Sequence, residues 1–282
     1  MFLFILTGAI LQFIKERKRK GNEKINLGDL TVIIPFRDEE SRIKSILNSY
    51  ENSLKTPAEI IFVNDASDDN SLELLLNLRN KNKNIKILTT SRPFGVSPCV
   101  LAGFKKAKGD AIVYMDSDLQ DPPEIIDELI KKYKDGCEVV HSVRKKRYGE
   151  SFLKIFINKI ANKLINLFSN IELVENAGDF KLIGRKALDE ILKINDIDPY
   201  LRGLSIWVGF KQEYVTYDRQ PRLYGKSKFG FFRNLNPYKE FIRGITSFSL
   251  VPLYFSLFIG VLFAFMSFIL LIIVLFNKYF GL

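Results

Sequence analysis

Cysteine and histidine are scarce in this 282-residue sequence. Its two cysteines, Cys99 and Cys137, provide neither a disulfide framework nor metal-ligand spacing, which favours a reducing compartment. The single histidine, His141, ends a predicted strand, where a structural role is favoured, and it excludes zinc sites built on histidines. Glycine-rich phosphate loops (G-x-x-x-x-G-K or G-x-G-x-x-G) are absent after every predicted strand. Any bound metal must therefore be held by oxygen ligands.

The charge balance and the apolar content narrow the choice of partners. The net charge is +10 and 47% of the residues are hydrophobic, ample for a large core. A basic balance suits nucleic acid or an anionic membrane. No nucleic-acid-binding motif is present, and the acidic turns described below would repel phosphates in the absence of a metal. The apolar, aromatic C-terminus instead favours membrane lipids, with no nucleic acid as partner.

Short β-rich runs alternate with helical patterns in the first half of the chain. One of these helices is predicted over residues 96–107. Such alternation predicts a mainly parallel, doubly wound α/β sheet. The strands are predicted at 30–35, 59–64, 85–89, 111–115 and 137–143.

The stretch AIVYMDSDLQDPPE (residues 111–124) is the central motif of the sequence. Asp116 and Asp118 follow an apolar strand and project to one side of the sheet's carboxyl edge, where open α/β sheets bind ligands. Pro122 and Pro123 are predicted to open the next helix. A surface turn with a capped helix is the alternative. The position directly after a buried strand favours a ligand site.

Acidic turns follow three of the predicted strands and converge on one edge of the sheet. Each alone could be a helix cap, and capping is favoured for Asp68 and Asp69. Together they suit a nucleotide whose diphosphate is bound through Mg²⁺ or Mn²⁺. The turns contain Asp38 and Glu39; Asp65, Asp68 and Asp69; and Asp116 and Asp118.

Six sequence blocks carry a family resemblance. Residues 33–39 (IIP-x(3)-E), FVNDASDD (62–69), DSDLQDPPE (116–124), NAGDFKLIGR (176–185), RGLSIWVGF (202–210) and YDRQPRLYGKSK (217–228) resemble the family 2 glycosyltransferases that load sugars onto polyprenyl phosphates. Within that family the blocks resemble dolichol-phosphate mannose synthases and bacterial polyprenyl-phosphate glucosyltransferases. The resemblance implies a GT-A-like fold. Asn64 and Arg37 depart from the usual pattern of the donor pocket.

The resemblance also implies a set of site residues. Asp179 would be the catalytic residue at the acceptor. Asp118 and Gln120, with Asp116, would hold Mg²⁺ or Mn²⁺. The acceptor phosphate would meet Arg144 and Arg147. The nucleotide sugar would be bound by Pro35, Glu39, Asp65, Asp116, Arg222, Lys226 and Lys228.

Four segments make up the predicted organisation. Residues 1–29 are an apolar and basic segment, for which a membrane-surface anchor is preferred over a partial span or a misassigned start. Residues 30–225 form the glycosyltransferase domain, whose amphipathic stretch 151–170 suits the membrane interface or packing on the domain equally well. Residues 226–248 are a basic, aromatic juxtamembrane segment. Residues 249–282 contain a predicted transmembrane helix, and the basic excess before it predicts a cytoplasmic catalytic domain at the cytoplasmic membrane.

The resulting functional hypothesis is an inverting, metal-dependent glycosyltransferase. It would move a sugar from a UDP- or GDP-linked donor to a polyprenyl phosphate. The alternative is a catalytically inactive membrane scaffold that keeps the fold, against which the retention of Asp116, Asp118, Gln120 and Asp179 argues. A homo-oligomer is a further alternative for its assembly.

Overall fold

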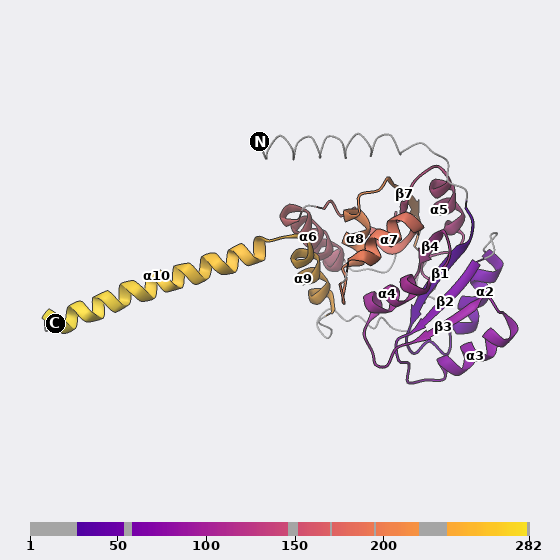
Figure 1. Cartoon of the computed structure of the whole chain (residues 1–282), viewed down its shortest axis with the longest axis horizontal. Helices are drawn as coiled ribbons and strands as arrows, with labels where there is room; N and C mark the ends of the chain where they lie inside the picture. Colours follow the sequence, from indigo (N-terminus) through magenta and orange to yellow (C-terminus); the bar gives the residue numbers. More distant parts are fainter. Residues whose placement is uncertain are drawn as a thin grey trace.

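The computed structural model describes residues 27–53, 58–145, 152–169, 171–194, 196–219 and 236–280. Most of them form an α/β domain, from which one long helix, α10 (Val251–Phe280), extends (Figure 1). The domain contains a seven-stranded sheet with helices on both of its faces. The predicted fold class is therefore confirmed.

The sheet has the strand order β3-β2-β1-β4-β6-β5-β7. The pairs β1–β2, β1–β4, β2–β3 and β5–β7 are parallel, whereas β6 runs antiparallel to both of its neighbours. All five predicted strands are present; the antiparallel strand β6 and the edge strand β7 were not among them. The strands are β1 (Leu30–Phe36), β2 (Ala58–Asn64), β3 (Ile85–Thr89), β4 (Ala111–Tyr114), β5 (Val139–Arg144), β6 (Ala177–Gly184) and β7 (Gln212–Tyr217).

Side chains of alternate strand residues supply two hydrophobic cores. On β1, Val32 and Ile34 pack toward the helices α2 (Ile43–Ser53), α3 (Ser71–Lys81) and α5 (Ile125–Lys134), whereas Ile33 faces α4 (Val96–Lys106) and α7 (Arg185–Lys193). The close approach of α4 needs Gly103, because a Cβ there would lie 2.6 Å from the side chain of Ile33. This two-sided burial explains why the strands read as continuous apolar runs.

The helix α5 begins later than its sequence suggests. Pro122 and Pro123 were predicted to open it, but the helix starts at Ile125. The two proline carbonyls instead accept hydrogen bonds from the N–H groups of Ile125 and Ile126. The two prolines therefore build the turn that connects the acidic edge to the helix.

A smaller layer joins the domain to α10. Ile165 of α6 (Phe152–Phe168) is buried in a cluster that also contains Tyr200, and Phe241 of α9 (Asn236–Phe248) packs against it. Leu167 of α6 is exposed, so this helix packs on the domain and still presents apolar surface. The helix α10 lies within residues 249–282, where a transmembrane helix was predicted, and its most apolar 18-residue window has a mean hydropathy of 3.1 with no part buried.

Candidate active site

The site lies where strands β1, β2, β4, β5 and β7 end and the antiparallel β6 begins. Parallel strands bring their carboxyl ends to one edge, which is where ligands bind in such sheets. The described residues with a positive φ other than glycine all lie in loops at this edge, where strained backbone often serves a site. They are Asp38 (53°), Ala66 (49°), Leu119 (55°) and Asn176 (63°).

The loop after β4 carries the predicted metal-binding residues. Leu119 adopts a left-handed conformation, and the N–H of Gln120 donates to Asp118 Oδ1 at 3.1 Å. The hydroxyl of Tyr114 donates to Asp116 Oδ1 at 3.2 Å. Burial together with the charges of Asp179, Asp121 and Asp118 raises the pKa of Asp116 to about 7. The loop therefore concentrates negative charge in a partly buried place.

Asp121 forms the deep end of this carboxylate group. It is 3% exposed and accepts a short hydrogen bond from the hydroxyl of Tyr217 on β7. Arg144 Nη2 lies 3.7 Å and Arg219 Nε 3.4 Å from its carboxylate, and Arg219 Nη2 lies 3.8 Å from Asp118. Within the described residues Asp121 Oδ2 has no hydrogen-bond partner. Arg144 Nε also donates to the hydroxyl of Tyr217 at 3.2 Å, whereas Arg219 contacts these carboxylates through ion pairs alone.

Asp179, near the start of β6, forms the other side of this carboxylate group. Arg202 of α8 (Leu201–Trp207) binds it through two hydrogen bonds, Nε to Oδ1 at 3.2 Å and Nη2 to Oδ2 at 2.7 Å. Burial opposes ionisation, but Arg202, followed by Lys181 and Arg144, lowers the pKa of Asp179 to about 2. Asp179 is therefore a carboxylate throughout the physiological pH range.

Buried polar side chains of the sheet and of α8 lie near Asp179. Lys181 pairs in the sheet with both Tyr114 and His141, and its Nζ donates to Ser205 Oγ of α8 at 3.0 Å. His141 lies 2.8 Å from Gln212 Oε1 and stacks on Tyr214. Burial and Lys181 lower the pKa of His141 to about 3, so this histidine is neutral at pH 7. Its predicted structural role agrees with this position.

The ends of β1 and β2 are arranged differently. Asp65, 8% exposed, accepts hydrogen bonds from the N–H groups of Phe94 at 2.7 Å and Gly95 at 2.9 Å. Gly95 has a φ of 93°, which favours glycine at this turn. Glu39 is buried and paired with Arg42 at 2.8 Å. Asp65 thus shapes the loop beside the expected base pocket through the peptide backbone.

The other acidic residues of these turns separate into two roles. Asp69 accepts the N–H groups of Ser71 at 3.0 Å and Glu40 at 3.1 Å, but the N-cap residue of α3 is Asn70, so Asp69 lies one residue before the cap position expected of it. Asp68 was expected to cap as well, but its exposed carboxylate forms an ion pair with Arg37 at 3.1 Å instead. The difference arises because β1 brings Arg37 next to this turn.

The structure brings together Asp116, Asp118, Gln120, Arg144 and Asp179 at one edge, with Pro35, Glu39 and Asp65 farther along it. Arg147, Arg222, Lys226 and Lys228 lie outside the described residues. Four further residues of this site were not predicted from the sequence: Asp121, Arg202, Tyr217 and Arg219. All four stand inside the sequence blocks that carry the resemblance, and the run of acidic and basic side chains there was the available signal.

A divalent cation suits this group of residues. Among the described side chains, no three of the types His, Cys, Asp and Glu already form a ligand cluster. Yet Asp116, Asp118 and Asp121 repel one another, and one buried oxygen of Asp121 lacks a hydrogen bond. Mg²⁺ typically takes one or two carboxylates and completes its shell with water and substrate phosphates. The residues present fit this mode of Mg²⁺ coordination.

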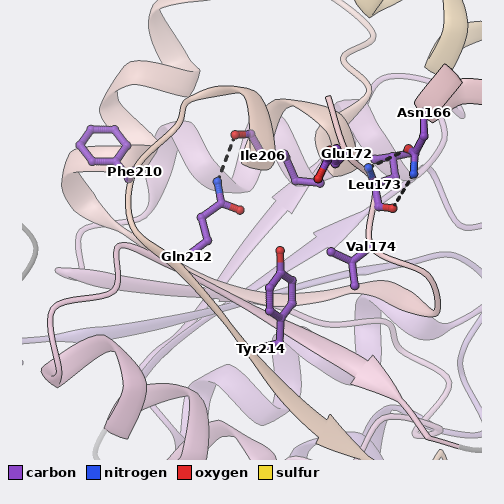
Figure 2. A pocket seen from close by; sticks show the side chains of 8 residues that line it. All are labelled: Asn166, Glu172, Leu173, Val174, Ile206, Phe210, Gln212 and Tyr214. Carbon is purple, nitrogen blue, oxygen red and sulfur yellow. Dashed lines mark hydrogen bonds between the residues drawn. The ribbon is translucent and has the colours of Figure 1, made fainter. Parts of the chain in front are cut away.

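A separate cavity of about 650 Å³ lies beside β7 and the segment between α6 and β6 (Figure 2). Its amide side chains are already engaged: Asn166 with the backbone of Leu173, and Gln212 with the carbonyls of Ser205 and Ile206. It lies against the first half of β7, whereas the charged group meets the end of that strand. The charged edge is thus the better candidate for the chemistry.

Fold and site together define a GT-A-like glycosyltransferase. Residues 31–192 match the family described as Glycosyl transferase family 2, so the chain belongs to that family. It is 38% identical over 257 residues to the uncharacterized glycosyltransferase YkcC of Bacillus subtilis, covering 89% of this chain and 77% of that one. It is 34% identical over 243 residues to the prophage bactoprenol glucosyl transferase homolog of Escherichia coli, covering 85% and 78%.

Solved structures support the fold. The mannosyltransferase PcManGT of Pyrobaculum calidifontis, solved in complex with GDP-Man and Mn²⁺, superposes with a TM-score of 0.56. The match covers 86% of this chain and 72% of that one at 14% sequence identity. At such low identity the likeness establishes the shared architecture alone.

Proposed function

We propose that this protein transfers a sugar from a nucleoside-diphosphate sugar to a polyprenyl phosphate at a membrane surface. The observation that carries the proposal is the charged group at the sheet edge. It combines carboxylates after β4 and at the start of β6 with guanidinium groups from β5, α8 and the end of β7. Relatives named bactoprenol glucosyl transferases suggest the acceptor. A similarly folded enzyme bound to GDP-Man and Mn²⁺ suggests the type of donor.

The donor half of the reaction releases a nucleoside diphosphate. As the bond between C1 of the sugar and the diphosphate oxygen breaks, negative charge develops on the leaving group. A divalent cation at Asp118, Gln120 and Asp116 would neutralise part of this charge. Arg219 is the described guanidinium nearest to Asp118, at 3.8 Å, and is placed to face the same diphosphate. Arg222, Lys226 and Lys228 follow it in the sequence and are proposed to add to this positive charge.

The acceptor half needs a phosphate oxygen positioned behind C1. A monophosphate is largely dianionic at neutral pH and attacks without losing a proton. With its pKa near 2, Asp179 would be a poor proton acceptor and is better suited to fix Arg202 in place. Arg202 and Arg144, with Arg147, would then orient the acceptor phosphate. Attack from the face opposite the diphosphate inverts the configuration at C1.

The lipid acceptor requires a membrane location. The apolar helix α10 is long enough to span a bilayer, and α6 and α9 lie next to the domain end from which it departs (Figure 1). Basic residues precede α10 in excess over those that follow, and this bias supports a catalytic domain on the cytoplasmic side.

One assay separates this proposal from an inactive scaffold. Membranes containing the protein are incubated with polyprenyl phosphate, Mn²⁺ and a panel of radiolabelled nucleotide sugars. We expect label in the lipid phase with one donor, and none when EDTA replaces Mn²⁺. Lipid extracts without label for every donor in the panel would favour the scaffold.

A further inference from the structure

The junction between the catalytic domain and α10 contains an apolar surface that the proposed chemistry does not use. A cavity of about 360 Å³ lies there. Apolar side chains from three parts of the chain line it, with Thr246, Ser247 and Ser249 between them. The apolar lining residues are Ile194, Leu204, Trp207, Phe248 and Leu250.

Two residues on this surface are unusually exposed for their type. Trp207, the single tryptophan of the chain, is 57% exposed at the end of α8. Leu250, on the connection between α9 and α10, is 61% exposed. Exposed large apolar residues that cluster around a groove mark an interaction site more often than scattered ones do.

Next to this cavity, α8 packs closely against the end of α9. Gly203 of α8 lets Phe248 approach, because a Cβ at this glycine would lie 2.3 Å from the phenylalanine ring. Tyr200 and Phe248 also form an edge-on ring contact, and Arg243 of α9 pairs with Asp198. Phe248 stands three residues before α10 begins. This packing holds α8, which ends at Trp207, against the end of α9.

We propose that the surface formed by Trp207 and Leu250 is immersed in the interfacial layer of the lipid bilayer. The occupant follows from continuity, because Leu250 lines the groove and the unburied apolar helix begins at the next residue. Tryptophan also prefers this layer, since its ring is apolar and its N–H is polar. The inference rests on the proposed membrane anchoring by α10.

Immersion of Trp207 in the bilayer would also affect the position of the active site. Arg202 stands five residues before Trp207 on α8, about 7.5 Å of helical rise. The same short helix thus has the Asp179 partner near one end and the membrane-contacting tryptophan at the other. The depth of Trp207 in the bilayer would set the height of the acceptor-phosphate site above the headgroups.

The natural tryptophan is the probe for the test. The full-length protein is placed in liposomes of phosphatidylcholine and phosphatidylglycerol, with and without bromine atoms on the upper acyl chains. We expect a blue-shifted Trp207 emission that loses most of its intensity with brominated lipid. A matched control is Trp207→Phe combined with Leu76→Trp, because Leu76 is exposed on α3, away from α10 (Figure 1). Its emission should be unchanged by bromine.

The possible outcomes distinguish the immersion of Trp207 from the membrane anchoring by α10. Protein that floats with the liposomes while Trp207 is unquenched overturns the inference and leaves the anchoring intact. A blue-shifted but unquenched emission would show a protein surface covering Trp207, which also overturns it. Protein that does not float with the liposomes overturns both.

Discussion

Two stretches of the same sheet edge use their carboxylates in opposite ways. After β1 and β2, Asp38, Asp65 and Asp69 accept hydrogen bonds from backbone N–H groups of neighbouring turns. After β4 and at the start of β6, carboxylates instead face one another and guanidinium groups. The first arrangement satisfies its own charge and shapes loops. In the second, Asp116, Asp118 and Asp121 repel one another and one buried oxygen of Asp121 has no hydrogen bond, which identifies where a cation and a diphosphate would bind.

The guanidinium groups of the second stretch also differ from one another. Arg202 binds Asp179 through two direct hydrogen bonds, whereas Arg219 lies 3.4 to 3.8 Å from its carboxylates. A bidentate pair fixes orientation, while a loose ion pair leaves the cation free to move toward a phosphate. We therefore assign Arg202 to positioning the acceptor and Arg219 to charge compensation at the donor.

Breaking the charged stretch should have the largest effect. Asp118→Ala should lower sugar transfer by roughly 10³-fold, since a metal that neutralises the leaving diphosphate contributes several kcal/mol. Asp69→Asn is the matched control on the other stretch, and its transfer rate should stay close to wild type. Initial rates with saturating donor measure both. Near-normal transfer in Asp118→Ala would remove the metal from the account.

Asp179→Asn should have the next largest effect, about 10²-fold slower transfer, because the amide keeps the shape but releases Arg202 from its ionic partner. Binding of donor and Mn²⁺ should be retained. Since the pKa of Asp179 is about 2, the carboxylate stays ionised, and the defect should be constant between pH 6 and 9. A defect that shrinks as the pH rises would instead indicate a proton-accepting role. Wild-type rates throughout would leave Asp179 as a turn residue.

A substitution in the first stretch should act on stability. Asp65→Asn replaces one of the two oxygens that accept the N–H groups of Phe94 and Gly95, which should lower the free energy of unfolding by about 1–3 kcal/mol. Thermal unfolding in detergent measures the change. Asp68→Asn, at a carboxylate that is 85% exposed, should stay within about 0.5 kcal/mol. Equal stability of the two variants would contradict the loop-shaping role of Asp65.

The smallest effect concerns Arg219. Removing its charge with Arg219→Gln should raise the affinity for Mn²⁺, measured without donor, by about threefold to tenfold, because a competing cation leaves Asp118. Arg219→Lys should bind Mn²⁺ much as wild type does. Lys193→Gln, at an exposed ion pair with Glu190, controls for net charge. Weaker Mn²⁺ binding in Arg219→Gln would show that Arg219 supports the metal site.

Local patterns made much of this architecture predictable. The strands β1 and β4 are continuous apolar runs, and such runs indicate burial on both faces of a sheet without further context. The edge strand β3 was also predictable because three of its five residues are Ile or Leu, whereas the edge strand β7 (QEYVTY) is mostly polar and has only Val215 and Tyr217 buried. The acidic loop after β4 was predictable because it directly follows one of the apolar runs.

Contacts between distant parts of the chain could not be predicted in this way. The hydrogen bond of Tyr217 to Asp121 joins residues 96 positions apart, and Arg202 reaches Asp179 across 23. These pairs depend on how β6 inserts between β4 and β5, which no local pattern encodes. The partners of Asp65 are also distant in the sequence. This residue was expected to contact the nucleotide base, and it accepts backbone N–H groups from a loop 29 residues away.

The most direct test of the account is the binding of Mn²⁺ by purified full-length protein in the presence of UDP or GDP. Titration of the free-Mn²⁺ electron paramagnetic resonance signal compares wild type, Asp118→Ala and Asp69→Asn. We predict one bound ion in wild type and in Asp69→Asn, and none in Asp118→Ala. Binding that survives in Asp118→Ala would contradict the claim that the carboxylates after β4 form the cation site.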